Sequence, residues 1–165
     1  MNKKENYKKI RDLLGTNDPQ DKILWFTIKL KNKSDIVIAN KVWKGIEFKV
    51  SKRFLGRVTK EKKLPMISAI EPDKDFLNYH IHAVLKLKEL QSRFNDQEIV
   101  NQVKLIISRF NEINSKDPNW FDYEITSFSN EDHIKNISNY MVKTSSRRYD
   151  PLLRFTNKQQ PVTQL

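Results

Sequence analysis

Two histidines separated by one apolar residue are the first candidates for chemistry in this chain. His80, Ile81 and His82 fall within residues 79–88, where alternating apolar positions predict a β-strand. Because successive strand residues point to opposite faces, both imidazoles lie on one face and Ile81 points to the other. Two imidazoles on one face can chelate a single metal ion. The alternative interpretation is a pair of ordinary histidines on a solvated sheet face.

A carboxylate upstream of the histidines is a candidate third ligand. Glu71 ends a predicted strand over residues 64–71, and the turn-forming residues 72–75 separate it from the histidine strand. If the two strands pair as a hairpin, Glu71 returns to a place beside His80. Two imidazoles and a carboxylate leave positions open for substrate oxygens, which predicts Mn²⁺ or Mg²⁺ acting on a phosphate, with Zn²⁺ as an alternative. The competing interpretation of Glu71 is a solvated strand end.

Tyr140 is the candidate nucleophile, on a helix predicted to begin at Ser129. Lys143 lies three residues further on and therefore shares its helix face. A phenol has a pKa of about 10, so attack at neutral pH needs help. A metal-polarised phosphodiester or the nearby ammonium of Lys143 supplies that help. The alternative is an aromatic side chain at the core boundary, because Ile137 and Met141 give this helix an apolar stripe.

Composition limits the function classes. The chain has 165 residues, of which 38% are hydrophobic, which suits one compact domain with a packed core. A formal charge of +11 favours a nucleic-acid partner over a merely basic protein. The chain has no cysteine, which excludes disulfides and thiol catalysis and fits a cytoplasmic protein. We see no apolar run long enough to cross a bilayer and no signal peptide.

The glycines exclude nucleotide-binding loops. Only Gly15, Gly45 and Gly56 occur, and they form neither a phosphate-binding P-loop nor a dinucleotide fingerprint. We therefore expect no ATP hydrolysis by this chain. A covalent link between a tyrosine and DNA would store the phosphodiester energy, so a broken strand could be resealed without ATP.

Periodicity and capping residues predict the elements that must position these side chains. Apolar alternation or helical spacing predicts strands over 22–31, 64–71, 79–88 and 120–128, and helices over 35–60, 96–113 and from Ser129. This order predicts an α+β fold of βαββαβ type, with a central antiparallel sheet of four to five strands flanked by helices. The expected organisation is a basic N-terminal extension (1–20) with a short helix over 4–14, one domain (21–148) and a C-terminal tail (149–165).

Several further side chains are open to two interpretations. The polar face of the helix over 35–60 is either solvated or in contact with DNA. Trp25 and Trp43 are candidates for base stacking in a non-catalytic binding module. His133 is a surface residue, a fourth ligand or a DNA contact, and Tyr149 is an alternative nucleophile. The basic helix residues are Lys41, Lys44, Lys49, Lys52 and Arg53, and Arg147 and Arg148 are expected phosphate contacts.

Three motifs give the chain a resemblance to the HUH endonuclease superfamily, especially its single-tyrosine rolling-circle replication initiators (Rep proteins). They are a hydrophobic strand at Phe26–Leu30, His80-Ile81-His82, and Tyr140-Met141-Val142-Lys143, in the family's order. The resemblance covers roughly residues 22–145. It implies a ferredoxin-like HUH fold and sequence-specific nicking and joining of single-stranded DNA.

The resemblance also implies roles for individual residues. Glu71, His80 and His82 would coordinate the metal, and Tyr140 would attack the scissile phosphate to leave a 5′-phosphotyrosine and a free 3′-OH. Lys143 would position the tyrosine or stabilise phosphate charge. Lys29 in the first motif and Lys86 are expected DNA contacts. The implied partners are origin or hairpin DNA, with a host helicase and polymerase. Alternatives are an HUH transposase or relaxase, a non-catalytic nucleic-acid-binding module, and a structural, partner-binding basic protein.

Overall fold

The described part of the chain alternates strands and helices. The computed structural model describes residues 8, 22–31, 35–59, 63–73, 78–87, 90, 93–114, 121–128, 132, 135–137, 139–141 and 152–156. The elements are β1 (Ile23–Leu30), α2 (Ile36–Leu55), β2 (Met66–Pro72), β3 (Tyr79–Lys86), α3 (Asp96–Asn114), β4 (Phe121–Phe128) and β5 (Leu152–Thr156). Of the predicted N-terminal extension only Lys8 is described, and it is helical.

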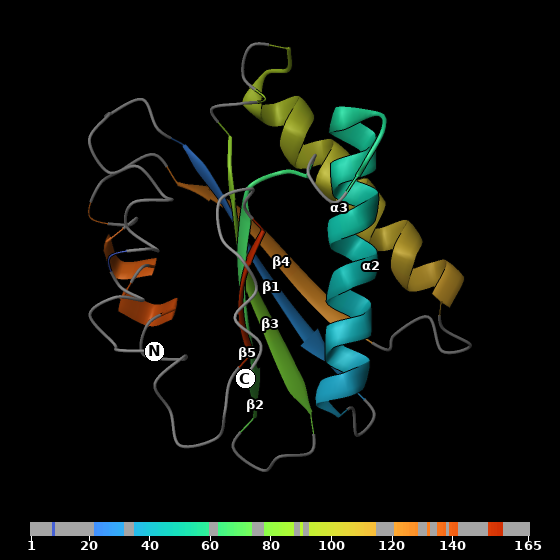
Figure 1. Ribbon diagram of the computed structural model, residues 1–165, viewed down its shortest axis with the longest axis vertical. Helices are drawn as coiled ribbons and strands as arrows, with labels where there is room; N and C mark the ends of the chain where they lie inside the picture. Colours follow the sequence, from blue (N-terminus) through green and yellow to red (C-terminus); the bar gives the residue numbers. More distant parts are fainter. Residues whose placement is uncertain are drawn as a thin grey trace.

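The strands form one antiparallel sheet in the order β4-β1-β3-β2-β5. Helix α2 connects β1 to β2, which flank β3, and α3 connects β3 to β4, which flank β1 (Figure 1). Each helical connection therefore skips over one strand that runs the other way, as in the ferredoxin-like arrangement. The predicted α+β fold with a βαββαβ order is confirmed.

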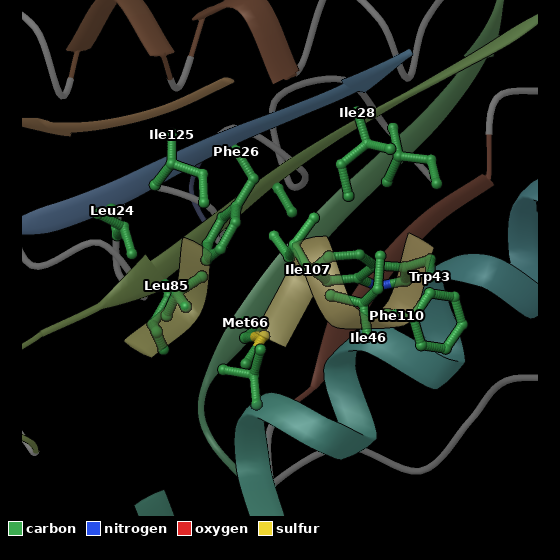
Figure 2. Close-up of a cluster of buried hydrophobic side chains, with 14 of the residues drawn as sticks. Leu24, Phe26, Ile28, Trp43, Ile46, Met66, Leu85, Ile107, Phe110 and Ile125 are labelled. Carbon is green, nitrogen blue, oxygen red and sulfur yellow. The ribbon is translucent and has the colours of Figure 1, made fainter. Parts of the chain in front are cut away.

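The main core lies between one face of the sheet and helices α2 and α3. Figure 1 shows both helices on the same side of the sheet, and Figure 2 shows the buried side chains between the layers. On β1 every second residue enters this core: Leu24, Phe26, Ile28 and Leu30. The residues between them point to the other face, which is covered in part by the helical turns within residues 132–141 (orange in Figure 1).

Helix α2 ends earlier than its sequence pattern suggests. Asp35 caps its start by accepting a hydrogen bond from the backbone N–H of Ile38, and Gly56 ends it with φ +72°. The left-handed conformation suits glycine and stops the helix, so the prediction that it extends to residue 60 is wrong. A spacing of four residues also drifts around a helix of 3.6 residues per turn. For this reason Ile38, at one end of the predicted stripe, is exposed rather than buried.

Gly45 allows α2 to approach α3 closely. A Cβ atom at this position would lie 2.6 Å from Cε2 of Phe110. We expect Gly45→Ala to destabilise the fold by about 1–3 kcal/mol through overpacking, even though alanine is the better helix former. Urea unfolding measures this, with the exposed Lys49→Ala on the same helix as the control. An alanine variant as stable as the wild type would show that the two helices are free to move apart.

Residues 152–156 do not belong to an unstructured tail. They form β5, which pairs with β2 from Met66↔Thr156 to Ile70↔Leu152. The prediction of a tail over 149–165 is therefore wrong for these residues. Without β5, strand β2 would be a sheet edge with unpaired backbone groups, and pairing satisfies them. Because this segment is short and is flanked by polar residues and prolines, its sequence pattern does not predict a strand.

None of the helices in the described residues combines the length and apolarity needed to cross a bilayer.

Candidate metal and tyrosine site

The hairpin of β2 and β3 brings the three predicted metal ligands together. Glu71 pairs directly with His80, and Ala69 pairs with His82. Directly paired residues project from the same face of a sheet, so the carboxylate and both imidazoles share the face opposite α2 and α3. The predicted pairing of Glu71 with His80 is confirmed.

The three side chains form a compact and largely buried cluster. Glu71 Oε1 lies 3.1 Å from His82 Nε2. One potential ligand atom from each of Glu71, His80 and His82 lies within 4.8 Å of the others. Glu71 is 5% exposed and His82 is 6% exposed, while His80 is half-buried. A solvated strand end and a solvated histidine pair do not describe these side chains.

The chemistry of this cluster fits a divalent ion. Within the described residues, the buried Nε2 of His80 has no hydrogen-bond partner, and burying such an atom unpaired is costly. Burial, followed by the charges of His82 and Lys29, lowers the pKa of His80 and so favours the neutral imidazole that binds metals. Ligand bonds of about 2.1 Å at right angles place neighbouring ligand atoms about 3.0 Å apart. The separation of 3.1 Å between Glu71 Oε1 and His82 Nε2 matches this requirement.

Tyr140 reaches the same cluster from a helical turn above the sheet. Its hydroxyl donates a hydrogen bond of 2.7 Å to Glu71 Oε1, and the hydroxyl oxygen lies 3.2 Å from His82 Nε2. The turn is anchored by the buried side chains of Ile137 and Met141, while Tyr140 remains 36% exposed. Tyr140 is therefore a boundary aromatic whose polar end belongs to the cluster of predicted ligands. Its distance from these ligands could not be read from the sequence.

Trp25 completes the cluster. From β1 its indole stacks on the His82 ring at 5.5 Å between centroids and 23° between planes, and it meets Tyr140 edge-on at 5.9 Å. A metal-binding histidine is usually oriented by a hydrogen bond from its second ring nitrogen. In the described part of the chain the buried Nδ1 of His82 has no such partner. The stacked indole covers one face of this ring and so restricts its orientation, together with the contacts of Glu71 and Tyr140.

The sequence indicates only a base-stacking role for Trp25. The signal that places it in the site is the register of β1 against β3, in which Trp25 pairs with Val84, diagonally next to His82. β1 and β3 are far apart in the sequence, so their register cannot be predicted from the local pattern that predicts the β2–β3 hairpin. Trp43, the other stacking candidate, is 1% exposed in the core under α2. The idea that Trp43 stacks on nucleic acid is therefore wrong.

We expect Trp25→Ala to weaken Mn²⁺ binding by about 10–100-fold, the usual cost of losing a group that orients a metal ligand. Trp25→Phe keeps a ring against His82 and should restore most of the affinity. Isothermal titration calorimetry measures both variants, with Thr126→Ala as the control because Thr126 pairs with Trp25 from β4. If Trp25→Ala and the wild type bind Mn²⁺ with equal affinity, stacking of Trp25 on His82 does not contribute to metal binding.

The predicted basic contacts divide into two groups. Lys29 is exposed, pairs with His80 on the site face and is close enough to lower its pKa. Lys86 projects from the same face but four residues beyond His82, which is about 13 Å along a strand. The fold therefore brings Lys29 to the site and leaves Lys86 away from it. The exposed cations of α2 lie across the sheet from the site: Lys41, Lys44, Lys49, Lys52 and Arg53.

Some predicted residues lie outside the described part of the chain. They are His133, Lys143, Arg147, Arg148 and Tyr149. Their predicted roles stay predictions.

Comparison with known proteins adds no relative. The chain has no significant match to a protein family, to a curated protein or to a solved structure.

Proposed function

We propose that this chain nicks and joins single-stranded DNA with Tyr140 as the nucleophile and a divalent metal as the cofactor, in the manner of HUH endonucleases. The observation that carries the proposal is the contact of Tyr140 Oη with Glu71 Oε1 and His82 Nε2, at 2.7 and 3.2 Å. The tyrosine and the ligand cluster belong to separate motifs, distant in the sequence. A nucleophile, a carboxylate and imidazoles that converge in this way suit transfer of a phosphodiester.

Each residue of the cluster has a distinct part in this reaction. An ion held by Glu71, His80 and His82 would polarise the scissile phosphate, and Mn²⁺ or Mg²⁺ suits this task. Glu71 Oε1 already accepts the phenolic hydrogen bond, so it is placed to take the proton as Tyr140 attacks. A bond forms between Tyr140 Oη and phosphorus, and the bond from phosphorus to the 3′ oxygen breaks. The 3′ oxygen leaves with a proton from solvent, and the reverse reaction reseals the strand.

The wider charge of the chain supports DNA as the substrate. The formal charge is +11, and Lys29 stands exposed at the edge of the site. The indole of Trp25 is half-buried and meets the Tyr140 ring edge-on at the site. We place the enzyme at the start of rolling-circle replication of a plasmid, phage or viral genome in the cytoplasm of its host. A separate helicase and polymerase would supply unwinding and synthesis.

The test of this function is a covalent adduct. The full chain is incubated with an origin-like single-stranded oligonucleotide and Mn²⁺, and an SDS-resistant protein–DNA species of increased mass is expected. A chain that binds DNA but forms no adduct in any metal would support the non-catalytic binding module. A transposase or relaxase would form the same adduct but prefer a different DNA end, which oligonucleotide panels would separate.

Backbone contacts at the site should appear in the salt dependence of binding. We expect Lys29→Ala to reduce the slope of log K against log salt concentration by about 0.7, the contribution of one phosphate contact on a single strand. Lys49→Ala, on the face of α2 across the sheet from the site, serves as the control and should leave the slope unchanged. A slope that falls only in Lys49→Ala would place the DNA on the helical face.

A further inference from the structure

We propose that the hydroxyl oxygen of Tyr140 is a fourth protein ligand of the metal whenever no DNA is bound. Glu71, His80 and His82 would then share the ion with the nucleophile itself. This inference rests on the metal half of the proposed function and does not depend on whether DNA is cleaved. In the alternative arrangement, Tyr140 contacts the metal-bound phosphate of the DNA but never the ion itself.

The spacing of three atoms carries the inference. Tyr140 Oη lies 2.7 Å from Glu71 Oε1 and 3.2 Å from His82 Nε2, and those two atoms are 3.1 Å apart. The atoms thus form a nearly equilateral triangle. Neighbouring ligands of an octahedral ion with bonds of about 2.1 Å lie about 3.0 Å apart. The spacing that serves the hydrogen bond from Tyr140 to Glu71 therefore also suits neighbouring ligands of one ion.

The surroundings hold the phenol in this place. Ile137 and Met141 are buried on the same helical turn, while the Tyr140 hydroxyl contacts Glu71 and His82. The indole of Trp25 meets the Tyr140 ring edge-on at 5.9 Å, while its face holds His82. One indole therefore orients both a predicted ligand and the nucleophile, which keeps the triangle of donor atoms together.

The charge of the cluster also favours another oxygen donor. Glu71 is the one carboxylate among the three proposed ligands, and an imidazole binds a metal ion in its neutral form. A divalent ion held by one carboxylate and two neutral imidazoles keeps a net positive charge. Mg²⁺ and Mn²⁺ are hard ions that prefer oxygen ligands, and the Tyr140 hydroxyl places such an oxygen 2.7 Å from Glu71 Oε1 and 3.2 Å from His82 Nε2.

Ligation by Tyr140 would also set the order of events. The scissile phosphate and the Tyr140 hydroxyl would compete for the same position on the ion. Binding of DNA would therefore release the hydroxyl from the ion, while its hydrogen bond to Glu71 Oε1 keeps it placed to give up its proton as it attacks. In the absence of DNA, the tyrosine would strengthen metal retention and be kept from other reactions.

Calorimetric titration of the full chain with Mn²⁺, in the absence of DNA, tests the proposal. We expect Tyr140→Phe to weaken binding by at least the roughly tenfold loss that follows removal of a metal's supporting group. The matched control is Tyr123→Phe, since Tyr123 is also 36% exposed but projects from the opposite face of the sheet, and it should bind like the wild type. Far-ultraviolet circular dichroism checks that both variants fold.

The possible outcomes separate the inference from the function. Equal affinity of Tyr140→Phe and the wild type would overturn ligation by Tyr140 and leave the three-residue metal site standing. Tighter binding by Tyr140→Phe would also overturn it, because the phenol would then compete with the ion for Glu71. If the wild type binds no Mn²⁺ at all, the metal half of the proposed function fails together with this inference.

Discussion

Tyr140→Phe is expected to abolish the covalent protein–DNA adduct while leaving binding of single-stranded DNA intact. The substitution removes only the hydroxyl, and the phenyl ring keeps its edge contact with Trp25. Removal of a covalent nucleophile costs other enzymes up to about 10⁶-fold in turnover, so the adduct should fall below detection. Gel electrophoresis in SDS measures the adduct, and fluorescence anisotropy of a labelled oligonucleotide measures binding.

The control for this experiment is Tyr123→Phe on β4. Tyr123 pairs with Ile28 and therefore projects from the face that carries α2 and α3. Its loss of a hydroxyl should leave adduct formation at the wild-type level. If Tyr140→Phe still forms the adduct, the nucleophile lies elsewhere, and Tyr149 is the first alternative to test.

Glu71→Gln is expected to eliminate both Mn²⁺ binding and adduct formation. The amide keeps the size of the side chain and an oxygen that accepts a hydrogen bond, but it removes the negative charge and the base that could take the phenolic proton. It also leaves His82, only 6% exposed, without the carboxylate that it faces. We therefore expect metal affinity to fall by more than the roughly 10–100-fold cost of losing an outer-shell partner. Calorimetry with Mn²⁺ and the adduct assay measure the two effects.

Chelation provides the matching test on the unchanged chain. EDTA should stop adduct formation by the wild type, and excess Mn²⁺ should restore it. Ser68→Ala is the control for Glu71→Gln, because Ser68 lies on the same strand, is buried and points to the opposite face. Adduct formation that continues undiminished in EDTA would remove the metal from the mechanism.

The sequence predicts those parts of the site that depend on local patterns. Alternation along β3 places His80 and His82 on one face, and a short connection to β2 returns Glu71 beside them. Strand alternation and hairpin pairing involve residues that are close in the sequence. The cluster of Glu71, His80 and His82 can therefore be predicted from the sequence. The βαββαβ order follows from the same kind of local periodicity.

The parts that could not be predicted depend on long-range packing. Tyr140 lies at the cluster because its helical turn, on which Ile137 and Met141 are buried, packs beside strand residues that are distant in the sequence. Trp25 lies there because β1 pairs with β3 in one register out of several that its alternation allows. Strand β5 forms because β2 offers an unpaired edge, and a segment as short as 152–156 has little pattern of its own.

We propose that Tyr140, and no other residue, becomes covalently linked to DNA at the metal cluster. Mass spectrometry of the trapped adduct after trypsin digestion tests it most directly. Cleavage after Lys135 and Lys143 puts Tyr140 in the peptide 136–143, whereas Tyr149 falls in the peptide 149–154. We predict that the nucleotide remnant is attached to the peptide 136–143, at Tyr140. A remnant on the peptide 149–154, or on any peptide without Tyr140, would contradict the account.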